Sequence, residues 1–350
     1  MMSIFASSGR AMALLRAACR WRRPQLSAAR PRQLSAAAVQ PRRVCVVGSG
    51  PAGMYAAAAL LATAPADTTV DIVERLCTPF GLIRFGVAPD HPEMKVMTEK
   101  FDLVAADERV RLIGNVEVGK DVSIEQLRAC YDGLVFAFGA DGDRALGLSG
   151  EQEIEGVHAA RDFVAWYNGL PSHRDLDFKL DEIEEVVVIG NGNVATDVAR
   201  VLLMPTEMLS RTDIAGHALA ALERSTVKRV TIAGRRGPAQ AAWTGKELRE
   251  ILNTLPEDVA VEISEEEIGL VKSEQDQAEM KAARVKKRCV DMLKTKLKAT
   301  GGCTQAEGER GLALRFCLSP TGLIAGEGGE ALAAVEFAKM ALEGEAGTPF

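Results

Sequence analysis

The chain has 350 residues and a formal net charge of −6, with 47% hydrophobic but only 5% aromatic residues. One hydrophobic core rarely serves more than about 250–300 residues, so two domains are expected. The composition argues against a disordered or disulfide-rich chain, and no apolar run reaches the roughly 20 residues that a membrane-spanning helix needs.

The cysteines provide no recognisable metal or redox motif. Seven are present, and no two have the Cys-x-x-Cys spacing. This argues against a zinc ribbon and against a dithiol redox site. No metal site is therefore expected.

The first 43 residues differ in kind from the rest. They hold nine arginines, no lysine and no acidic residue, with abundant Ala and Ser. Arg16, Arg20 and Arg23 share one face of a helical wheel, as in a mitochondrial transit peptide, which we assign to residues 1–42. A disordered nucleic-acid-binding arm is the alternative. All 48 acidic residues lie in the remainder, so an acidic partner would need a local basic patch.

The first chemical motif is the glycine-rich stretch in "RVCVVGSGPAGMYAAAALLA". An expected strand at residues 44–47 runs through Gly48, Gly50 and Gly53 into an alanine-rich helix. Gly48 permits a tight turn, Gly50 lets the backbone approach a pyrophosphate, and Gly53 allows close packing of helix and strand. The phosphate is then expected at the positive end of the helix.

The next strand, "TVDIVER", ends in Glu74, 21 residues after Gly53. An acid there accepts hydrogen bonds from an adenosine ribose and repels a 2′-phosphate. The pair of signals predicts FAD or NAD at this first turn. A tight turn without a ligand is the alternative.

A second glycine-rich turn occurs in "EEVVVIGNGNVATDVARVLL". An expected strand at residues 186–189 leads into Gly190, Gly192 and Ala195, so the third small residue is Ala. The same phosphate chemistry is predicted here.

The strand that follows this turn carries the opposite charge at its end. "VKRVTIAGRRG" finishes in Arg235 and Arg236, with no acid at the ribose position. Two guanidiniums can bind a phosphate in fork geometry, which favours NADP(H) over NAD(H). An inserted loop and helix at residues 205–227 explain the long spacing. A solvated Arg-Arg-Gly turn is the alternative.

One further block makes a family resemblance specific. "PFGLIRFGVAPDHPEMK" (residues 79–95), together with "GSGPAG", "GNGNVATDVAR" and "GRRGPAQAAWTGKELRE", closely resembles the family of mitochondrial NADPH:adrenodoxin (ferredoxin) oxidoreductases. The resemblance runs from residue 43 to about residue 300. It implies an α/β fold with two Rossmann-like dinucleotide-binding domains, one for FAD and one for NADP.

The resemblance also assigns residues to the two cofactors. With the glycines of the first turn, the FAD set is Gly48, Gly50, Ala52, Gly53, Glu74, Leu82 and Val118. With those of the second turn, the NADP set is Gly190, Asn191, Gly192, Asn193, Val194, Arg235, Arg236 and Glu247. For Glu247 a structural role is the alternative, because "TGKE" also has the capping-box pattern.

The expected chemistry is hydride transfer from NADPH to a flavin, which requires positioning more than acid–base groups. The flavin then passes electrons singly to an iron–sulfur protein. By resemblance, His91 and Asp197 are the catalytic candidates for a hydrogen-bond or proton path near the flavin. A surface His beside a turn and a helix-dipole charge are the respective alternatives.

A basic stretch at residues 281–298 is the candidate partner surface. It holds eight Lys or Arg and the single acid Asp291. Lys281, Arg284 and Arg288 fall on one helical stripe, and by resemblance Arg284 and Arg288 dock a 2Fe–2S ferredoxin (adrenodoxin). The apolar residues expected to pack inward are Val285, Cys289 and Met292. A solvated helix face is the alternative, and nucleic acid is not expected because no aromatic residues are interleaved.

The chain departs from the family after residue 300. Two strand-like alternations can finish the second domain, but no Gly-Trp segment followed by Gly-Pro-x-Gly, as the family has at this point, comes after them. We therefore expect an FAD domain that is incomplete at the C-terminus. The expected division is a leader at 1–42, an FAD-binding domain at 43–145, an NADP-binding domain at 146–340, and a truncated return toward the FAD domain at 341–350.

Three functional hypotheses follow. The first is an FAD-dependent NADPH-ferredoxin reductase of the mitochondrial matrix, serving cytochrome P450 and iron–sulfur pathways. The second is a truncated, non-catalytic NADP(H)- or ferredoxin-binding isoform. The third is a flavoprotein similar to the glutamate synthase small subunit. A monomer is expected, with peripheral association with the inner membrane as an open alternative.

Overall fold

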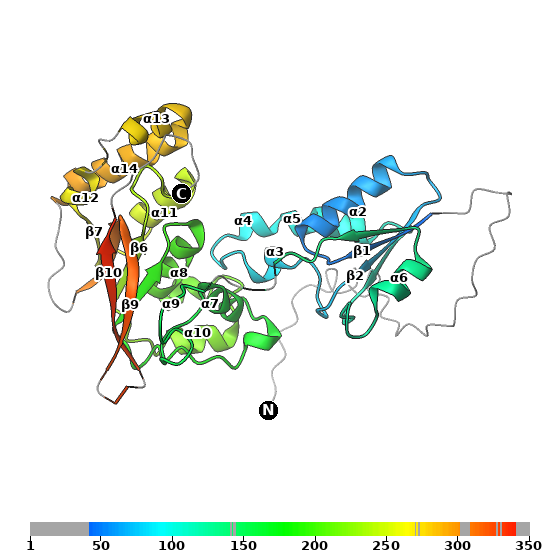
Figure 1. Cartoon of the computed structure of the whole chain (residues 1–350), viewed down its shortest axis with the longest axis horizontal. Helices are drawn as coiled ribbons and strands as arrows, with labels where there is room; N and C mark the ends of the chain where they lie inside the picture. Colours follow the sequence, from blue (N-terminus) through cyan, green and yellow to red (C-terminus); the bar gives the residue numbers. More distant parts are fainter. Residues whose placement is uncertain are drawn as a thin grey trace. The chain divides into compact units, whose positions relative to one another are not determined.

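The structure is a computed structural model that describes residues 42–140, 142, 145–269, 271, 274–301, 309–326, 328–329 and 331–340. Residues 1–41 of the predicted leader and the predicted return segment, 341–350, lie outside the described residues. The chain divides into two compact units (Figure 1). One comprises the chain up to residue 87 with residues 91–142, and the other comprises residues 88–90 with the chain from residue 143 onward.

The first unit contains a parallel sheet with the strand order β3-β2-β1-β4. Its strands are β1 (Arg43–Val47), β2 (Thr69–Val73), β3 (Val110–Ile113) and β4 (Gly133–Phe136). Its helices are α2 (Pro51–Thr63), α3 (Leu82–Phe85), α4 (Pro92–Lys95), α5 (Met97–Ala105) and α6 (Ile124–Cys130). Because side chains alternate along a strand, Val46 packs with α2 and α5, while Cys45 and Val47 pack on the opposite face with α6.

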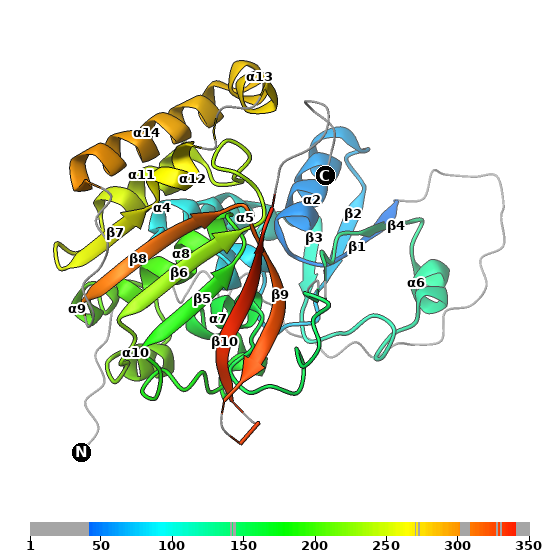
Figure 2. The same ribbon diagram turned by 60° about the vertical axis from the view of Figure 1, so that its left-hand side comes forward.

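The second unit contains a parallel sheet with the order β5-β6-β8-β7. Its strands are β5 (Glu185–Ile189), β6 (Arg229–Gly234), β7 (Val259–Ile263) and β8 (Arg310–Phe316). Strand β8 enters between β6 and β7, so the alternation after residue 300 completes this sheet. The antiparallel hairpin of β9 (Leu318–Ala325) and β10 (Leu332–Lys339) follows it, drawn in orange and red in Figure 2.

The second unit has one large apolar core, to which most of its helices contribute buried side chains. The helices are α7 (Ala160–Tyr167), the 3-10 helix η1 (Pro171–His173), α8 (Asn193–Leu203), α9 (Thr206–Leu209), α10 (Gly216–Leu222), α11 (Gly245–Asn253), α12 (Glu265–Gly269), α13 (Glu274–Ala282) and α14 (Arg284–Thr300). Helices α9 and α10 fill the predicted insertion. No helix among the described residues has the length and apolarity needed to cross a bilayer.

One local prediction is wrong. Residues 281–298 do not form a single helix, because the backbone of Ala283 is extended, with φ −129° and ψ 104°, between α13 and α14. This break lets Met280 of α13 pack against the small cluster that contains the buried Val290 of α14. Lys281 therefore lies on a different helix from Arg284 and Arg288. The predicted α/β fold with two parallel Rossmann-like sheets is confirmed.

Candidate functional site

The three glycines of the first turn differ in what a side chain would meet at each position. Gly48 has φ +102°, and a Cβ there would lie 2.6 Å from the carbonyl oxygen of Ala137. A Cβ on Gly53 would lie 1.9 Å from the carbonyl oxygen of Gly48. By contrast, a Cβ on Gly50 would meet no atom within 4 Å. Gly48 and Gly53 are therefore required by backbone packing, whereas Gly50 leaves open space at the start of α2.

The carboxylate of Glu74 is fixed beside this turn. Its Oε2 accepts hydrogen bonds from the backbone N–H of Ser49 at 2.9 Å and from the Ser49 hydroxyl at 2.5 Å. Its Oε1 accepts one from the N–H of Leu76 at 2.9 Å. The structure thus places Glu74, the predicted ribose acceptor, beside the first glycine turn. Sequence reasoning missed Ser49, and the hydroxyl residue between the first two glycines was the available signal.

The other predicted residues of the first unit divide into two groups. Leu82, at the start of α3, is 65% exposed and Ala52 is also exposed. The N–H of Phe80 donates to the carbonyl of Ser49 at 3.1 Å, so the segment before Leu82 lies against the turn. Val118 instead packs partly buried in the cluster on the opposite face of β1 from Val46. Only the first group faces open space near the turn.

The second glycine turn has an open position at Gly192, as the first turn has at Gly50. Gly190 has φ +123°, and a Cβ on Gly192 would meet no atom within 4 Å. Asn191, however, is buried: its side-chain Nδ2 donates to the carbonyl of Arg315 at 3.2 Å. A Cβ on Gly234 would lie 2.4 Å from that Nδ2. The Asn191 side chain therefore fits against β6 and β8.

Arg235 and Arg236 lie where β6 ends, and both side chains are exposed. Among the described residues, neither guanidinium has an ion-pair partner. The predicted acid-to-cation contrast between the two turns is therefore present. Glu74 is held by its own turn, and the two arginines are available to bind an anion.

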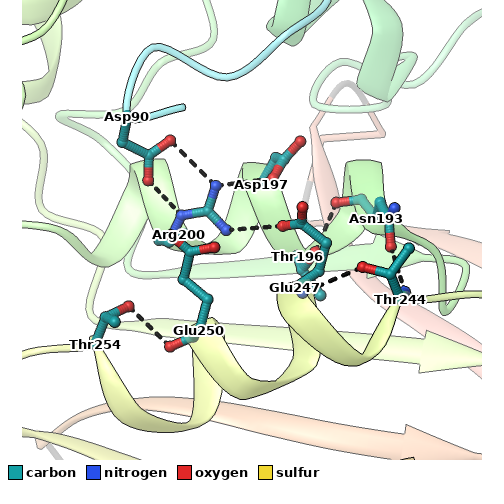
Figure 3. A network of polar contacts seen from close by, with 9 residues as sticks. All are labelled: Asp90, Asn193, Thr196, Asp197, Arg200, Thr244, Glu247, Glu250 and Thr254. Carbon is teal, nitrogen blue, oxygen red and sulfur yellow. Dashed lines mark hydrogen bonds and ion pairs between the residues drawn. The ribbon is translucent and has the colours of Figure 1, made fainter. Parts of the chain in front are cut away.

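A buried polar network lies between α8 and α11 (Figure 3). Arg200 of α8 is fully buried. Its guanidinium contacts Asp90, with Nη2 3.1 Å from Oδ1 and Nε bonded to Oδ2. It also contacts Asp197 Oδ1 at 2.8 Å and Glu247 Oε2 at 3.6 Å. Burial alone lowers the pKa of Arg200, but the Asp90 bond and the neighbouring carboxylates outweigh it, so the pKa is raised and the guanidinium stays charged.

This network adds structural contacts for two residues whose role has alternatives, Asp197 and Glu247. Asp197 forms an ion pair with Arg200, so it does more than complement the helix dipole. The Thr244 hydroxyl accepts a hydrogen bond from the backbone N–H of Glu247 at 3.3 Å, as in half of a capping box, while the Glu247 carboxylate faces Arg200. Sequence reasoning missed Arg200 itself. An arginine within the apolar run "VARVLL" of a helix was the signal.

His91 and Asp197 lie in different units. His91 precedes α4 in the first unit, where its carbonyl accepts from the N–H of Met94 at 3.1 Å. Asp197 is on α8 in the second unit. A joint role for the two residues therefore stays a prediction.

Helix α14 presents the basic face expected from the sequence. Its exposed basic residues are Arg284, Lys287, Arg288, Lys294 and Lys298. Cys289 is buried and Met292 partly buried, as expected, but Val285 is 53% exposed. The expectation that Val285 packs inward is wrong, because the break at Ala283 places it in the exposed first turn of α14.

The chain is similar to known oxidoreductases. Residues 42–297 match the pyridine nucleotide-disulphide oxidoreductase family. The chain belongs to this family. The chain is also similar to a protein named NADPH:adrenodoxin oxidoreductase, mitochondrial, from Arabidopsis thaliana, with 47% identity over 75% of this chain and 53% of that protein's length. Its counterpart from Bos taurus is 44% identical over 87% of this chain and 61% of its own length.

A solved structure is also similar to this chain. Mycobacterium tuberculosis FprA in complex with NADPH superposes with a TM-score of 0.74 and 38% sequence identity, covering 85% of this chain and 67% of that chain. The resemblance inferred from the motifs is thus confirmed. The chain spans between about half and three fifths of the length of the curated relatives named here.

Proposed function

We propose that this chain carries electrons from NADPH through FAD to a 2Fe–2S ferredoxin in the mitochondrion. One observation carries the proposal. The two glycine turns are each followed by side chains of opposite charge at the end of the next strand, Glu74 in the first unit and the pair Arg235 and Arg236 in the second. A protein that binds one kind of dinucleotide twice does not need this contrast.

The first unit fits FAD. The open space over Gly50 admits a pyrophosphate at the N-terminus of α2. Glu74, fixed by Ser49, offers carboxylate oxygens to ribose hydroxyls. The exposed Leu82 lies on the segment that packs against the turn. When bound, FAD supplies chemistry that takes up a hydride and releases electrons one at a time.

The second unit fits NADP(H). Gly192 leaves open space at the N-terminus of α8, where backbone N–H groups attract phosphate. Arg235 and Arg236 are exposed, and each guanidinium can bind a 2′-phosphate through two parallel hydrogen bonds. Glu247 is oriented by Arg200, so its position relative to the turn is fixed.

The partner and the compartment follow from charge and from the relatives. An acidic ferredoxin is complementary to the exposed basic residues of α14, while the chain as a whole is negative. The relatives from Arabidopsis thaliana and Bos taurus are named as mitochondrial adrenodoxin oxidoreductases. The arginine-rich leader predicted from the sequence agrees with mitochondrial import.

Purification and visible spectroscopy of the chain test the proposal. We expect a flavin spectrum that NADPH bleaches, that NADH bleaches far more slowly, and that oxidised 2Fe–2S ferredoxin restores. Binding of NADP⁺ without any flavin would contradict electron transfer and support a non-catalytic binding protein. A flavin that NADPH bleaches but ferredoxin does not reoxidise would favour a flavoprotein similar to the glutamate synthase small subunit.

A further inference from the structure

The loop that carries the two arginines is tied to the second glycine turn. It runs from the end of β6 to the start of α11, residues 235–243. The N–H of Ala242 donates to the carbonyl of Asn191 at 2.8 Å, and the N–H of Thr244 donates to the side-chain Oδ1 of Asn193 at 2.9 Å. The downstream end of the loop is therefore fixed to the residues between and after the glycines.

Asn193 is well placed to hold this connection (Figure 3). It is the first residue of α8, and its carbonyl accepts a hydrogen bond from the Thr196 hydroxyl at 2.6 Å. Thr244 is the N-cap of α11, and its hydroxyl accepts from the N–H of Glu247. Glu247 in turn contacts Arg200 of α8. The Asn193–Thr244 and Arg200–Glu247 contacts thus both connect α8 to α11, and of these two the Asn193 contact adjoins the loop.

We propose that Asn193 is a positioning residue that sets the selectivity of this site for a 2′-phosphorylated dinucleotide. This inference rests on the proposed function, in which Arg235 and Arg236 bind that phosphate. The Oδ1 of Asn193 accepts from Thr244 and, as an acceptor, cannot stabilise a phosphate oxygen, which leaves the Nδ2 as the donor of this side chain. Its hydrogen bond instead reduces the motion of the loop, so that the arginines lose less conformational entropy when the nucleotide binds.

The two roles open to Asn193 predict different outcomes. If its amide contacts the pyrophosphate directly, removing it weakens NADP⁺ and NAD⁺ equally, because both carry that group. If it positions the loop, removing it weakens NADP⁺ selectively. The selective loss also disappears once the arginines are gone, since residues that act as a unit are not additive.

Isothermal titration calorimetry on the 350-residue chain distinguishes these roles. The variants are Asn193→Ala, the double variant Arg235→Ala/Arg236→Ala, and their combination. We expect Asn193→Ala to weaken NADP⁺ binding about five- to tenfold, in line with the loss of one hydrogen bond and its ordering effect. NAD⁺ binding changes less than about twofold, and Asn193→Ala has no further effect in the arginine-free background.

A matched control separates selectivity from simple loosening of α11. The Thr254 hydroxyl donates to the carbonyl of Glu250 at 2.8 Å at the other end of the same helix. Thr254→Ala should leave the NADP⁺-to-NAD⁺ ratio of dissociation constants unchanged. Equal weakening of both nucleotides by Asn193→Ala, additivity with the arginine variants, or no effect would each overturn the inference.

A measurement without nucleotide distinguishes failure of this inference from failure of the proposed function. Hydrogen exchange of the Thr244 amide should accelerate in Asn193→Ala, whatever the chain binds. If exchange accelerates but wild-type chain does not prefer NADP⁺, the proposed function is wrong and the selectivity inference falls with it. If wild-type chain prefers NADP⁺ while exchange and selectivity are both unchanged in the variant, only the inference is wrong.

Discussion

Arg200 and Asp90 are 110 residues apart in sequence, yet two nitrogens of the Arg200 guanidinium bond both carboxylate oxygens of Asp90. The Arg200 side chain is 0% exposed and that of Asp90 is 10% exposed. Asp90 lies in the short segment 88–90 that belongs to the second unit. The polar core of the second unit is therefore completed by a residue that precedes β3 in the chain.

The first prediction concerns the stability of this network. Arg200→Met should destabilise the second unit by about 3–5 kcal/mol, because it leaves Asp90 and its neighbouring carboxylates buried without their cation. Urea unfolding followed by the fluorescence of the buried Trp166 and Trp243 measures this. Lys228→Ala is the control, since it breaks an exposed pair with Glu184 and should cost less than about 1 kcal/mol. Equal losses in the two variants would contradict the assigned role.

The second prediction concerns nucleotide selectivity. Arg235→Ala/Arg236→Ala should weaken NADPH binding by about 3 kcal/mol, or roughly a hundredfold, through loss of charge-assisted hydrogen bonds to phosphate. NADH binding should change less than about twofold. Fluorescence titration of both nucleotides measures the dissociation constants. Arg224→Ala, which removes an exposed arginine of the same unit, serves as the control, and a parallel loss of both nucleotides would argue against a 2′-phosphate site.

The third prediction concerns stability at alkaline pH. Burial, reinforced by the charge of Asp71, raises the pKa of Cys45 from 9.0 to about 12. The folded state therefore retains a proton that the unfolded chain releases above about pH 9. The retained proton stabilises the folded state fully below pH 9, and this stabilisation is lost as pH rises toward 12. The free energy of unfolding then falls by up to about 1.4 kcal/mol per pH unit.

Denaturant unfolding of the first unit at pH 8, 9 and 10 checks this slope. Cys45→Ala should make the decline between pH 9 and 10 shallower, because the titrating thiol is gone. Cys77→Ala, at an exposed cysteine, should leave the decline unchanged. Identical slopes in wild type and Cys45→Ala would show that the thiol does not couple to folding.

The fourth prediction concerns the partner surface. Arg284→Glu/Arg288→Glu should weaken the binding of an acidic 2Fe–2S ferredoxin at least tenfold at low salt, with a smaller loss at high salt. Reduction of a small dye by NADPH should be retained. Lys120→Glu, an exposed substitution in the first unit with 76% of the side chain exposed, should not affect docking. Similar loss in Lys120→Glu would indicate net charge and not a defined surface.

The fifth prediction concerns His91 and Asp197. If they form a proton path near the flavin, His91→Gln and Asp197→Asn should each slow flavin reduction by NADPH and alter its pH profile. Stopped-flow absorbance measures both quantities. Because Asp197 also contacts Arg200, unfolding of each variant is measured in parallel. Unchanged rates and pH profiles in both stable variants would remove the two residues from the catalytic set.

Some features of the two units are predictable from the sequence because they depend on local patterns. The strand-turn-helix at Gly48 and at Gly190 follows largely from short-range chemistry, since the positive φ at both positions favours glycine. The register of β1 against β2 likewise places Glu74 beside its turn. Such features depend on residues within one βα unit.

Other features needed contacts between distant segments. The burial of Arg200 depends on Asp90 and Glu247, which no periodicity connects to it. The break at Ala283 accompanies the packing of Met280 in a cluster with Val290, and no Gly or Pro stands at the break. The tie between Asn193 and Thr244 spans 51 positions.

By itself, the sequence determined the two glycine turns and the opposite charges that follow them, because backbone sterics and side-chain charge act locally. Only the tertiary structure decided which polar groups are buried together, that the Asn191 side chain faces the sheet while Asn193 holds the arginine loop, and where the basic helix begins. Those outcomes depend on satisfying buried charges and hydrogen bonds among segments far apart in the chain.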